Sequence, residues 1–216
     1  MKIKKLYISS LLLAASLIGT TGCDDFLNRD LQGSSDEGQT INPENVDNLV
    51  IAAYAHMVSG EDMNSPFSLW PYGNVRADDA YKGGANSEDG SHFHFLEIAT
   101  GMTTDNWAFD DIWYRLYSGV ARANAALKSL DGMDEATYPK KNERIGEMRF
   151  LRGHYMFLLK VMFKHIVYVD ETIPTTDYTK ISNRQYTNDQ LWQKIADDFK
   201  FAYDHLPDTQ VEKGRP

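Results

Sequence analysis

The chain has 216 residues, with 22 Lys and Arg against 31 Asp and Glu, and a formal net charge of −9. From Cys23 onward the balance is 19 against 31, or −12, which disfavours a nucleic-acid partner because phosphate contacts need clustered basic side chains. The single cysteine excludes an intramolecular disulfide and a cysteine-based zinc site.

Residues 1–22 have the pattern of a signal peptide. Three lysines among the first five residues precede a run of 17 uncharged residues, which is shorter than the roughly 20 apolar residues of a membrane-spanning helix. The run ends in Thr-Thr-Gly directly before Cys23, which resembles the lipobox of bacterial lipoproteins, whose cysteine is acylated on sulfur and nitrogen. We expect Cys23 to be the lipid anchor. The alternative is an incidental free cysteine behind an ordinary cleavage site.

The mature chain begins with a polar segment and then becomes helical. Residues 23–40 are rich in Gly, Ser and Asp, so we expect the acylated cysteine to be followed by a flexible tether. Asn42 and Pro43 are typical of a helix N-terminus. Apolar residues then recur at spacings of three and four up to about residue 60: Val46, Leu49, Val50, Ala53 and Met57. We assign residues 41–216 to one helical domain.

Residues 61–104 show little periodicity and contain many Gly and Pro residues. A loop of 44 residues inside a compact domain is either functional or a misassigned element. His92 and His94 alternate with Phe93 and Phe95, so short strands are possible over residues 91–98.

Three amphipathic helices follow, over residues 105–131, about 139–164, and from the capping-box pattern Thr187-x-x-Gln190 to Pro207. We therefore expect a mainly all-α fold of tetratricopeptide-like helix pairs in a right-handed superhelix, with a long irregular loop region. Aromatic residues surround most of the third helix, so we also expect the domain to be incomplete at its C-terminus.

No residue pattern indicates catalysis. Adjacent carboxylates occur at residues 78–79, 110–111 and 197–198, and we expect them on solvated helix faces and caps. His92 and His94 would share one side of a strand, but no third metal ligand stands nearby. The P-loop, dinucleotide-binding and nucleophile-elbow motifs are all missing from the sequence. We expect no enzyme activity, no metal and no cofactor.

The irregular segment has the composition of a sugar-binding site, in which aromatic rings face the C–H surfaces of a sugar and polar side chains bind its hydroxyls. The ligand-binding candidates are Trp70, Tyr72, Asn74, Arg76, Asp79 and Tyr81. Three aromatic residues on predicted helices, Trp113, Tyr117 and Trp192, are expected in the core, whereas Trp107 is equally suited to either role. We expect Arg149 and Arg152 to link adjacent helices through Glu143 or Glu147.

Four motifs of the mature chain carry a resemblance to a known family. They are the start Cys23-Asp24-Asp25-Phe26-Leu27, an early acidic segment Asn74-Val75-Arg76-Ala77-Asp78-Asp79, a Trp-x-x-x-Tyr helix with Trp113 and Tyr117 that leads to Asn124, and, as the most specific, Gly146-Glu147-Met148-Arg149-Phe150-Leu151-Arg152-Gly153. Together they resemble the N-terminal domain of the RagB/SusD family of outer-membrane lipoproteins. The similarity covers the whole mature chain, although family members are usually more than twice as long.

The resemblance implies a lipoprotein on the cell surface, anchored in the outer membrane, that binds glycans or other nutrients. It also implies a partner, a TonB-dependent transporter of the SusC type, and no catalysis. The alternative is a lipid-anchored helical-repeat scaffold that binds protein partners and no sugar, since a fold does not fix a function.

Overall fold

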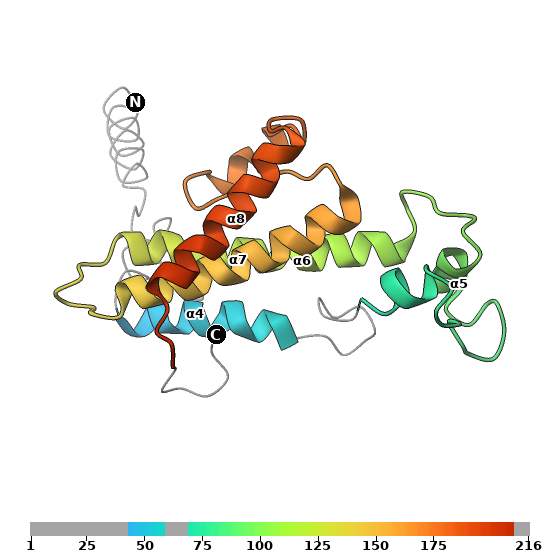
Figure 1. The fold of residues 1–216 in the computed structure, drawn as a ribbon, viewed down its shortest axis with the longest axis horizontal. Helices are drawn as coiled ribbons and strands as arrows, with labels where there is room; N and C mark the ends of the chain where they lie inside the picture. The colour runs from blue at the N-terminus through green and yellow to red at the C-terminus, as the bar shows by residue number, and fades with distance from the viewer. Residues whose placement is uncertain (1–42, 59–68, 210–216) are drawn as a thin grey trace, which may run out of the picture. The chain divides into compact units, whose positions relative to one another are not determined.

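The computed structural model describes residues 43–58 and 69–209 (Figure 1). The predicted signal peptide 1–22, the anchor Cys23 and the tether 23–40 lie outside the described residues. The elements are α4 (Pro43–Val58), the π-helical turn η1 (Pro71–Val75), α5 (Ser91–Glu97), α6 (Trp107–Asp131), α7 (Lys141–Phe163), the 3-10 turn η2 (Thr175–Lys180) and α8 (Asn188–His205). Within these two ranges all regular structure is helical, so the predicted fold class is confirmed.

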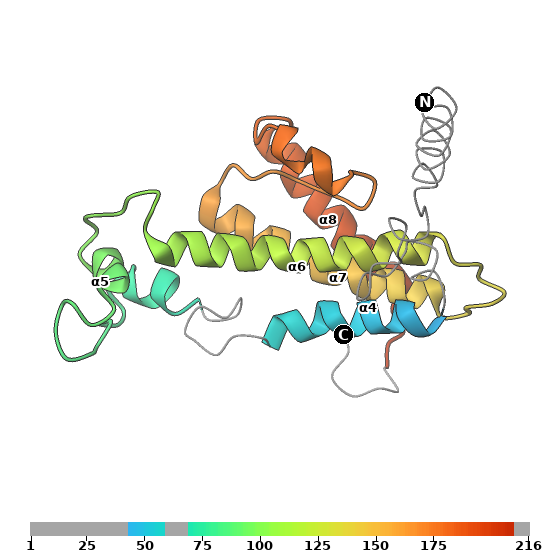
Figure 2. The ribbon, with the colours of Figure 1, turned by 180° about the vertical axis from the view of Figure 1, so that it is seen from behind.

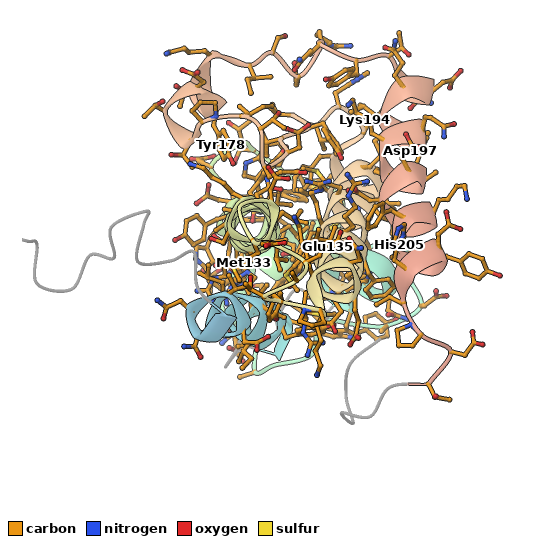
Figure 3. All side chains as sticks on the ribbon, turned by 90° about the vertical axis from the view of Figure 1, so that its left-hand side faces the viewer. Met133, Glu135, Tyr178, Lys194, Asp197 and His205 are labelled. Atoms are coloured by element: carbon orange, nitrogen blue, oxygen red, sulfur yellow. The ribbon has the colours of Figure 1, made fainter. Side chains whose placement is uncertain are left out.

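Helices α6 and α7 form an antiparallel pair at the centre of the described part. Figures 1 and 2 show them side by side, with α4 running along them. Helix α4 packs on α6 and also contacts α7, while α8 packs on α7. Figure 3, which looks along α6 and α7, shows α8 crossing at one side of the bundle. Successive helices therefore pack on one another, as the tetratricopeptide analogy requires.

The helix ends agree with the sequence signals. Asn106 caps α6, because its side-chain oxygen accepts the N–H of Ala108 at 3.0 Å. The capping box of α8 is complete: Gln190 donates its N–H to Thr187 Oγ1 at 3.3 Å, and Thr187 donates its N–H to Gln190 Oε1 at 2.9 Å. Pro207 follows shortly after the end of α8.

The predicted apolar faces make the core. On α6 the predicted residues are all buried: Ile112, Leu116, Val120, Ala123, Leu127 and Leu130. All of them except Ala123 pack with buried residues of α4, α7 and α8 in one cluster. Burying a large apolar side chain contributes roughly 1.5–3 kcal/mol, so this cluster is the main source of stability. None of the helices in residues 43–58 and 69–209 has the length and apolar character needed to span a membrane.

A glycine lets α6 and α7 approach closely. A Cβ atom built on Gly119 of α6 would lie 2.6 Å from ring atoms of Tyr155 on α7. Tyr155 is fully buried, so its ring has no open space to move into. Close packing therefore requires glycine at position 119, although alanine has the higher helix propensity, by up to about 1 kcal/mol.

We expect Gly119→Ala to lower the free energy of unfolding by about 1–2 kcal/mol, since overpacking costs roughly 1–3 kcal/mol and propensity returns part of it. Gly146→Ala is the matched control, because its Cβ would meet the flexible Leu206 side chain at 3.3 Å. We expect that variant to be as stable as the wild type within about 0.5 kcal/mol. Urea denaturation measures both values. A Gly119→Ala protein as stable as the wild type would contradict this packing.

Arg152 links three segments, but not through the partners predicted from the sequence. Its guanidinium donates to both carboxylate oxygens of Asp198 on α8, at 2.8 and 2.7 Å, and to Asn124 Oδ1 on α6 at 3.0 Å. It also donates to Glu171. The expected link between helices is therefore present, whereas the expected partner, Glu143 or Glu147, is wrong for Arg152.

Glu143 and Glu147 form ion pairs with another arginine of α7. Arg144, which is buried, forms ion pairs with Glu143 at 3.0 Å and with Glu147. Arg149 instead approaches Asp198 at 3.9 Å and lies over the Phe201 ring, 4.4 Å from its centroid. Arg149 therefore also links α7 to α8, as expected, but its partner is Asp198 and not Glu143 or Glu147. Asp198, expected on a solvated helix face, is buried in the structure.

Residues 91–98 do not form the strand that the alternating pattern suggested. Residues 91–97 form α5, which begins after Gly90 in a left-handed conformation with φ 68°. Phe93 and Leu96 are its buried residues, and their spacing of three is that of a helix face. The alternation of His and Phe was therefore a weaker signal than the pairing of Phe93 with Leu96.

Candidate functional site

Residues 69–104 of the irregular segment gather at the end of the helix pair where α6 begins and α7 ends (Figure 1). A cavity of about 690 Å³ opens there. Its lining comes from the segment around η1, from α5, from the loop before α6, and from the facing ends of α6 and α7. The lining residues are Tyr72, Arg76, Leu96, Met102, Thr103, Thr104, Phe109, Asp110, Trp113, Val161, Met162 and Phe163.

The cavity combines apolar walls with a few polar groups. Tyr72, Phe109 and Trp113 supply aromatic surface. The polar side chains are a guanidinium, a carboxylate and two hydroxyls, from Arg76, Asp110, Thr103 and Thr104, and all four residues are exposed. Pockets that bind small ligands have this composition, with apolar and aromatic walls and a small number of placed polar groups.

Two of the six sequence candidates, Tyr72 and Arg76, lie in the cavity wall. The Tyr72 hydroxyl donates to the carbonyl oxygen of Ala108 at 2.5 Å, and its ring packs against Phe109 with centroids 6.3 Å apart. Burial raises the pKa of Tyr72 well above its ordinary value, so the phenol stays protonated and keeps this hydrogen bond. Tyr72 therefore fixes η1 against the start of α6 and offers its ring, not its hydroxyl, to the cavity.

The π-helical turn brings Arg76 to the cavity mouth. The Asn74 N–H donates to the Trp70 carbonyl at 3.0 Å, and the Arg76 N–H donates to the Pro71 carbonyl at 3.3 Å. Pro71 stands at the first position of η1, where its missing N–H is no loss. The Arg76 side chain is exposed, so its guanidinium is accessible to a ligand in the cavity.

The other four candidates lie on the same segment but not in the cavity lining. Trp70 is half-buried and meets the edge of Phe93, with ring centroids 6.4 Å apart. Asn74, Asp79 and Tyr81 are exposed, and Tyr81 is 86% exposed. The structure thus brings together Tyr72 and Arg76 and leaves Asn74, Asp79 and Tyr81 on the adjacent surface.

Some lining residues were assigned only to the core by the sequence or were not singled out at all. Trp113 packs against Tyr117 and Phe163, with centroids 4.7 and 4.8 Å apart, and it also lines the cavity. Phe109 and Asp110 could have been found, because they occupy the first turn of α6, the helix that follows the irregular segment of the sequence. Residues 161–163 could not have been predicted as lining residues, because their place depends on the antiparallel pairing of α6 and α7.

The exposed helical tryptophans differ in their surroundings. Trp192, expected in the core, is partly exposed and packs on Phe157 with centroids 6.0 Å apart. Trp107, the undecided residue, is exposed and meets the edge of His92 at 4.6 Å. Trp192 is therefore only partly a core residue, and Trp107 belongs to the surface near α5.

The histidine pair has no shared ligand geometry. His92 and His94 lie two apart on helix α5, so they do not share the face that a strand would have given them. His92 packs on Trp107, and His94 Nδ1 lies 3.6 Å from Glu97. In the two described ranges, no group of three or more His, Cys, Asp or Glu side chains is placed to hold a metal ion.

Comparisons with known proteins relate this arrangement to one family. A family model described as SusD-like, starch-binding and associating with the outer membrane, matches residues 25–216. The surface glycan-binding protein A from Bacteroides fluxus has a similar solved structure, with a TM-score of 0.64 and 21% sequence identity. The similarity covers 81% of this chain and 37% of that one, so the chain spans little more than a third of that protein. Curated protein sequences gave no match.

Proposed function

This chain belongs to the SusD-like family, and we propose that it is a cell-surface lipoprotein that binds a glycan and passes it to a TonB-dependent outer-membrane transporter of the SusC type. The role is binding and not catalysis. The description of the family as starch-binding supports a glycan ligand, and so does the name of the structural neighbour from Bacteroides fluxus.

The observation that carries the proposal is the cavity at the end of the α6–α7 pair. Its volume of about 690 Å³ lies within the roughly 300–1,000 Å³ of small-ligand pockets. The rings of Tyr72 and Phe109 offer apolar surface to the C–H face of a sugar. Arg76 and Asp110 offer charged partners to its hydroxyls, and such hydrogen bonds are stronger than those between neutral groups.

We propose that the ligand site extends from this cavity along the segment that holds the sequence candidates. Tyr72 and Arg76 would bind the sugar within the cavity. Asn74, Asp79 and Tyr81 are exposed beside it and would contact further sugar units of a longer chain. Trp70, half-buried on Phe93, would hold the segment in place and expose one edge to the ligand.

The proposed anchor is Cys23, with residues 1–22 removed as a signal peptide. We expect Cys23→Ala to shift the protein from the membrane fraction to the soluble fraction, because each buried acyl CH₂ contributes about 0.8 kcal/mol to membrane binding. Fractionation of cells labelled with a palmitate analogue measures both location and acylation. Ser34→Ala, in the tether, is the control and should stay labelled and membrane-bound. Unchanged membrane association of the Cys23→Ala protein would contradict the anchor.

Affinity electrophoresis through gels that contain polysaccharides tests the proposed function. The panel is soluble starch, xylan, mannan, xyloglucan and pectin, with serum albumin as the non-binding standard. We expect the wild-type chain to be retarded relative to albumin in at least one gel. If no gel retards it while it co-purifies with a barrel transporter, the protein-binding scaffold is the correct function.

A further inference from the structure

A lysine ammonium group lies inside the loop that follows the proposed ligand segment. Lys82 Nζ donates to the carbonyl oxygens of Gly83 at 2.9 Å, Asn86 at 2.8 Å and Asp89 at 2.6 Å. An ammonium group has three N–H donors, so all three are used within the loop. The Lys82 side chain therefore has no donor left to offer a ligand or a partner protein.

Little else holds this loop. Residues 83–89 are all exposed, so burial of apolar side chains does not order them. Asp89 Oδ2 accepts the N–H of Ala85 at 3.0 Å, and Asn86 Oδ1 accepts the N–H groups of Glu88 at 2.9 Å and of Asp89 at 3.2 Å. Three carbonyl dipoles converge on one point, and the positive charge of the Lys82 ammonium group between them offsets their mutual repulsion.

The chain direction in the loop also depends on this arrangement. Gly83 and Gly84 both have positive φ, 75° and 84°. A Cβ on Gly84 would lie 2.5 Å from the Asp89 carboxylate, so the two ends of the loop approach each other at this glycine. The loop is thus a closed turn of backbone with the ammonium of Lys82 at its centre.

The loop joins two parts of the proposed site. Tyr81, a ligand candidate that is 86% exposed, directly precedes Lys82. At the other end, Gly90 is the N-cap of α5, whose Leu96 lines the cavity and whose Phe93 packs on Trp70. On its N-terminal side the backbone of Tyr81 is held to η1, because Ala80 donates its N–H to the Asn74 carbonyl at 3.2 Å; on its C-terminal side, residues 82–90 set its direction.

We propose that Lys82 is a positioning residue of the glycan site: its ammonium group is the built-in cation of a carbonyl cage that holds residues 83–90 in one conformation and so fixes Tyr81 beside the cavity. The positioning role of Lys82 rests on the proposed glycan-binding function. The carbonyl cage does not depend on that function. Lys82 acts through the backbone of the loop and touches no ligand.

Amide exchange measured by NMR on the full chain tests the cage. In Lys82→Ala we expect the N–H groups of Ala85, Glu88 and Asp89 to exchange about tenfold faster, because several charge-assisted hydrogen bonds are lost. The α6 and α7 amides should keep their wild-type rates. Propylammonium replaces the deleted part of the side chain and should restore slow exchange, whereas tetramethylammonium, which has no N–H donor, should not. Wild-type exchange rates in Lys82→Ala, or equal rescue by both cations, would overturn the cage.

The affinity arm uses the panel polysaccharide that retards the wild-type chain most. We expect Lys82→Ala to bind it several-fold more weakly, with recovery in propylammonium, and Lys200→Ala, which removes one exposed lysine of α8, to bind as the wild type does. Unchanged affinity of Lys82→Ala would overturn the positioning role. If the wild-type chain binds no polysaccharide, the proposed function and the positioning role fail together, and the exchange arm still decides whether the cage exists.

Discussion

Arg152→Ala is expected to lower the free energy of unfolding by about 3–5 kcal/mol, because it leaves a buried carboxylate without the cation that is hydrogen-bonded to it. Arg152 and Asp198 are each only 2% exposed. Without the guanidinium, the Asp198 carboxylate keeps the hydroxyl of Tyr168 at 3.2 Å and the Arg149 guanidinium, whose Nε lies 3.9 Å away and is too distant for a hydrogen bond. Since a whole domain is stable by about 5–15 kcal/mol, this loss threatens folding itself.

The charge of Arg152 persists at every accessible pH. Burial alone would lower the pKa of Arg152, but hydrogen bonds and charge interactions with Asp198 raise it above its ordinary value. The interaction therefore depends on geometry and burial, and not on titration of the arginine.

Lys200→Ala is the matched control for Arg152→Ala. The Lys200–Asp204 pair has an N–O distance of 2.7 Å, the same as the Arg152 Nη2–Asp198 pair, but its side chains are 72% and 40% exposed. Exposed pairs contribute about 0–1 kcal/mol, so we expect almost no change in urea denaturation. The double variant Arg152→Met with Asp198→Leu should recover part of the lost stability, because the buried Asp198 charge is removed with its partner, and Glu171 and Arg149, which lose partners, are partly exposed. A loss below about 1 kcal/mol in Arg152→Ala would contradict this account of the bundle.

The second large effect is expected on ligand affinity. Arg76→Ala should weaken glycan binding by about tenfold to a hundredfold, because hydrogen bonds to a charged group contribute roughly 1.5–3 kcal/mol. Arg76 lines the cavity and is exposed, so the change should leave the free energy of unfolding unaltered within about 0.5 kcal/mol. Isothermal titration calorimetry measures the affinity, and urea denaturation measures the stability.

Lys200→Ala removes the same unit of charge from α8 and again serves as the control for Arg76→Ala. Its affinity should equal that of the wild type. An equal loss in both variants would mean that net charge, and not the Arg76 guanidinium, sets the affinity. If Arg76→Ala binds the glycan as tightly as the wild type does, the part of the cavity around Arg76 does not belong to the ligand site.

The helices of the bundle were predictable from the sequence because local signals determine them. The spacing of Ile112, Leu116 and Val120 marks the buried face of α6, and Thr187 with Gln190 forms the capping box of α8. These signals act over three or four residues, which is the range that a helix period and a cap cover.

The partners of the arginines were not predictable in the same way. Arg152 and Asp198 are 46 residues apart in the sequence, so no local spacing indicates their contact. The local candidates Glu143 and Glu147 lie on the same helix as Arg152, but they pair with Arg144. The contact between Arg152 and Asp198 exists only because α8 packs across α7.

The candidate site was predictable in part. The composition of the irregular segment indicated Tyr72 and Arg76, which line the cavity. The rest of the lining comes from Trp113 and residues 161–163 on the ends of two long helices, where aromatic and apolar residues also serve the core. Sequence alone cannot separate those two roles, because a residue at a helix end has one face toward the core and another toward the cavity.

Hydrogen exchange with and without bound polysaccharide tests the central claim, that the glycan binds at the cavity where α6 begins and α7 ends. We expect protection to increase in residues 69–83 and 102–113 and to stay unchanged in α8. The polysaccharide is the one that retards the wild-type chain most in affinity electrophoresis. Protection confined to α8, or binding that protects neither of the two cavity segments, would contradict the account.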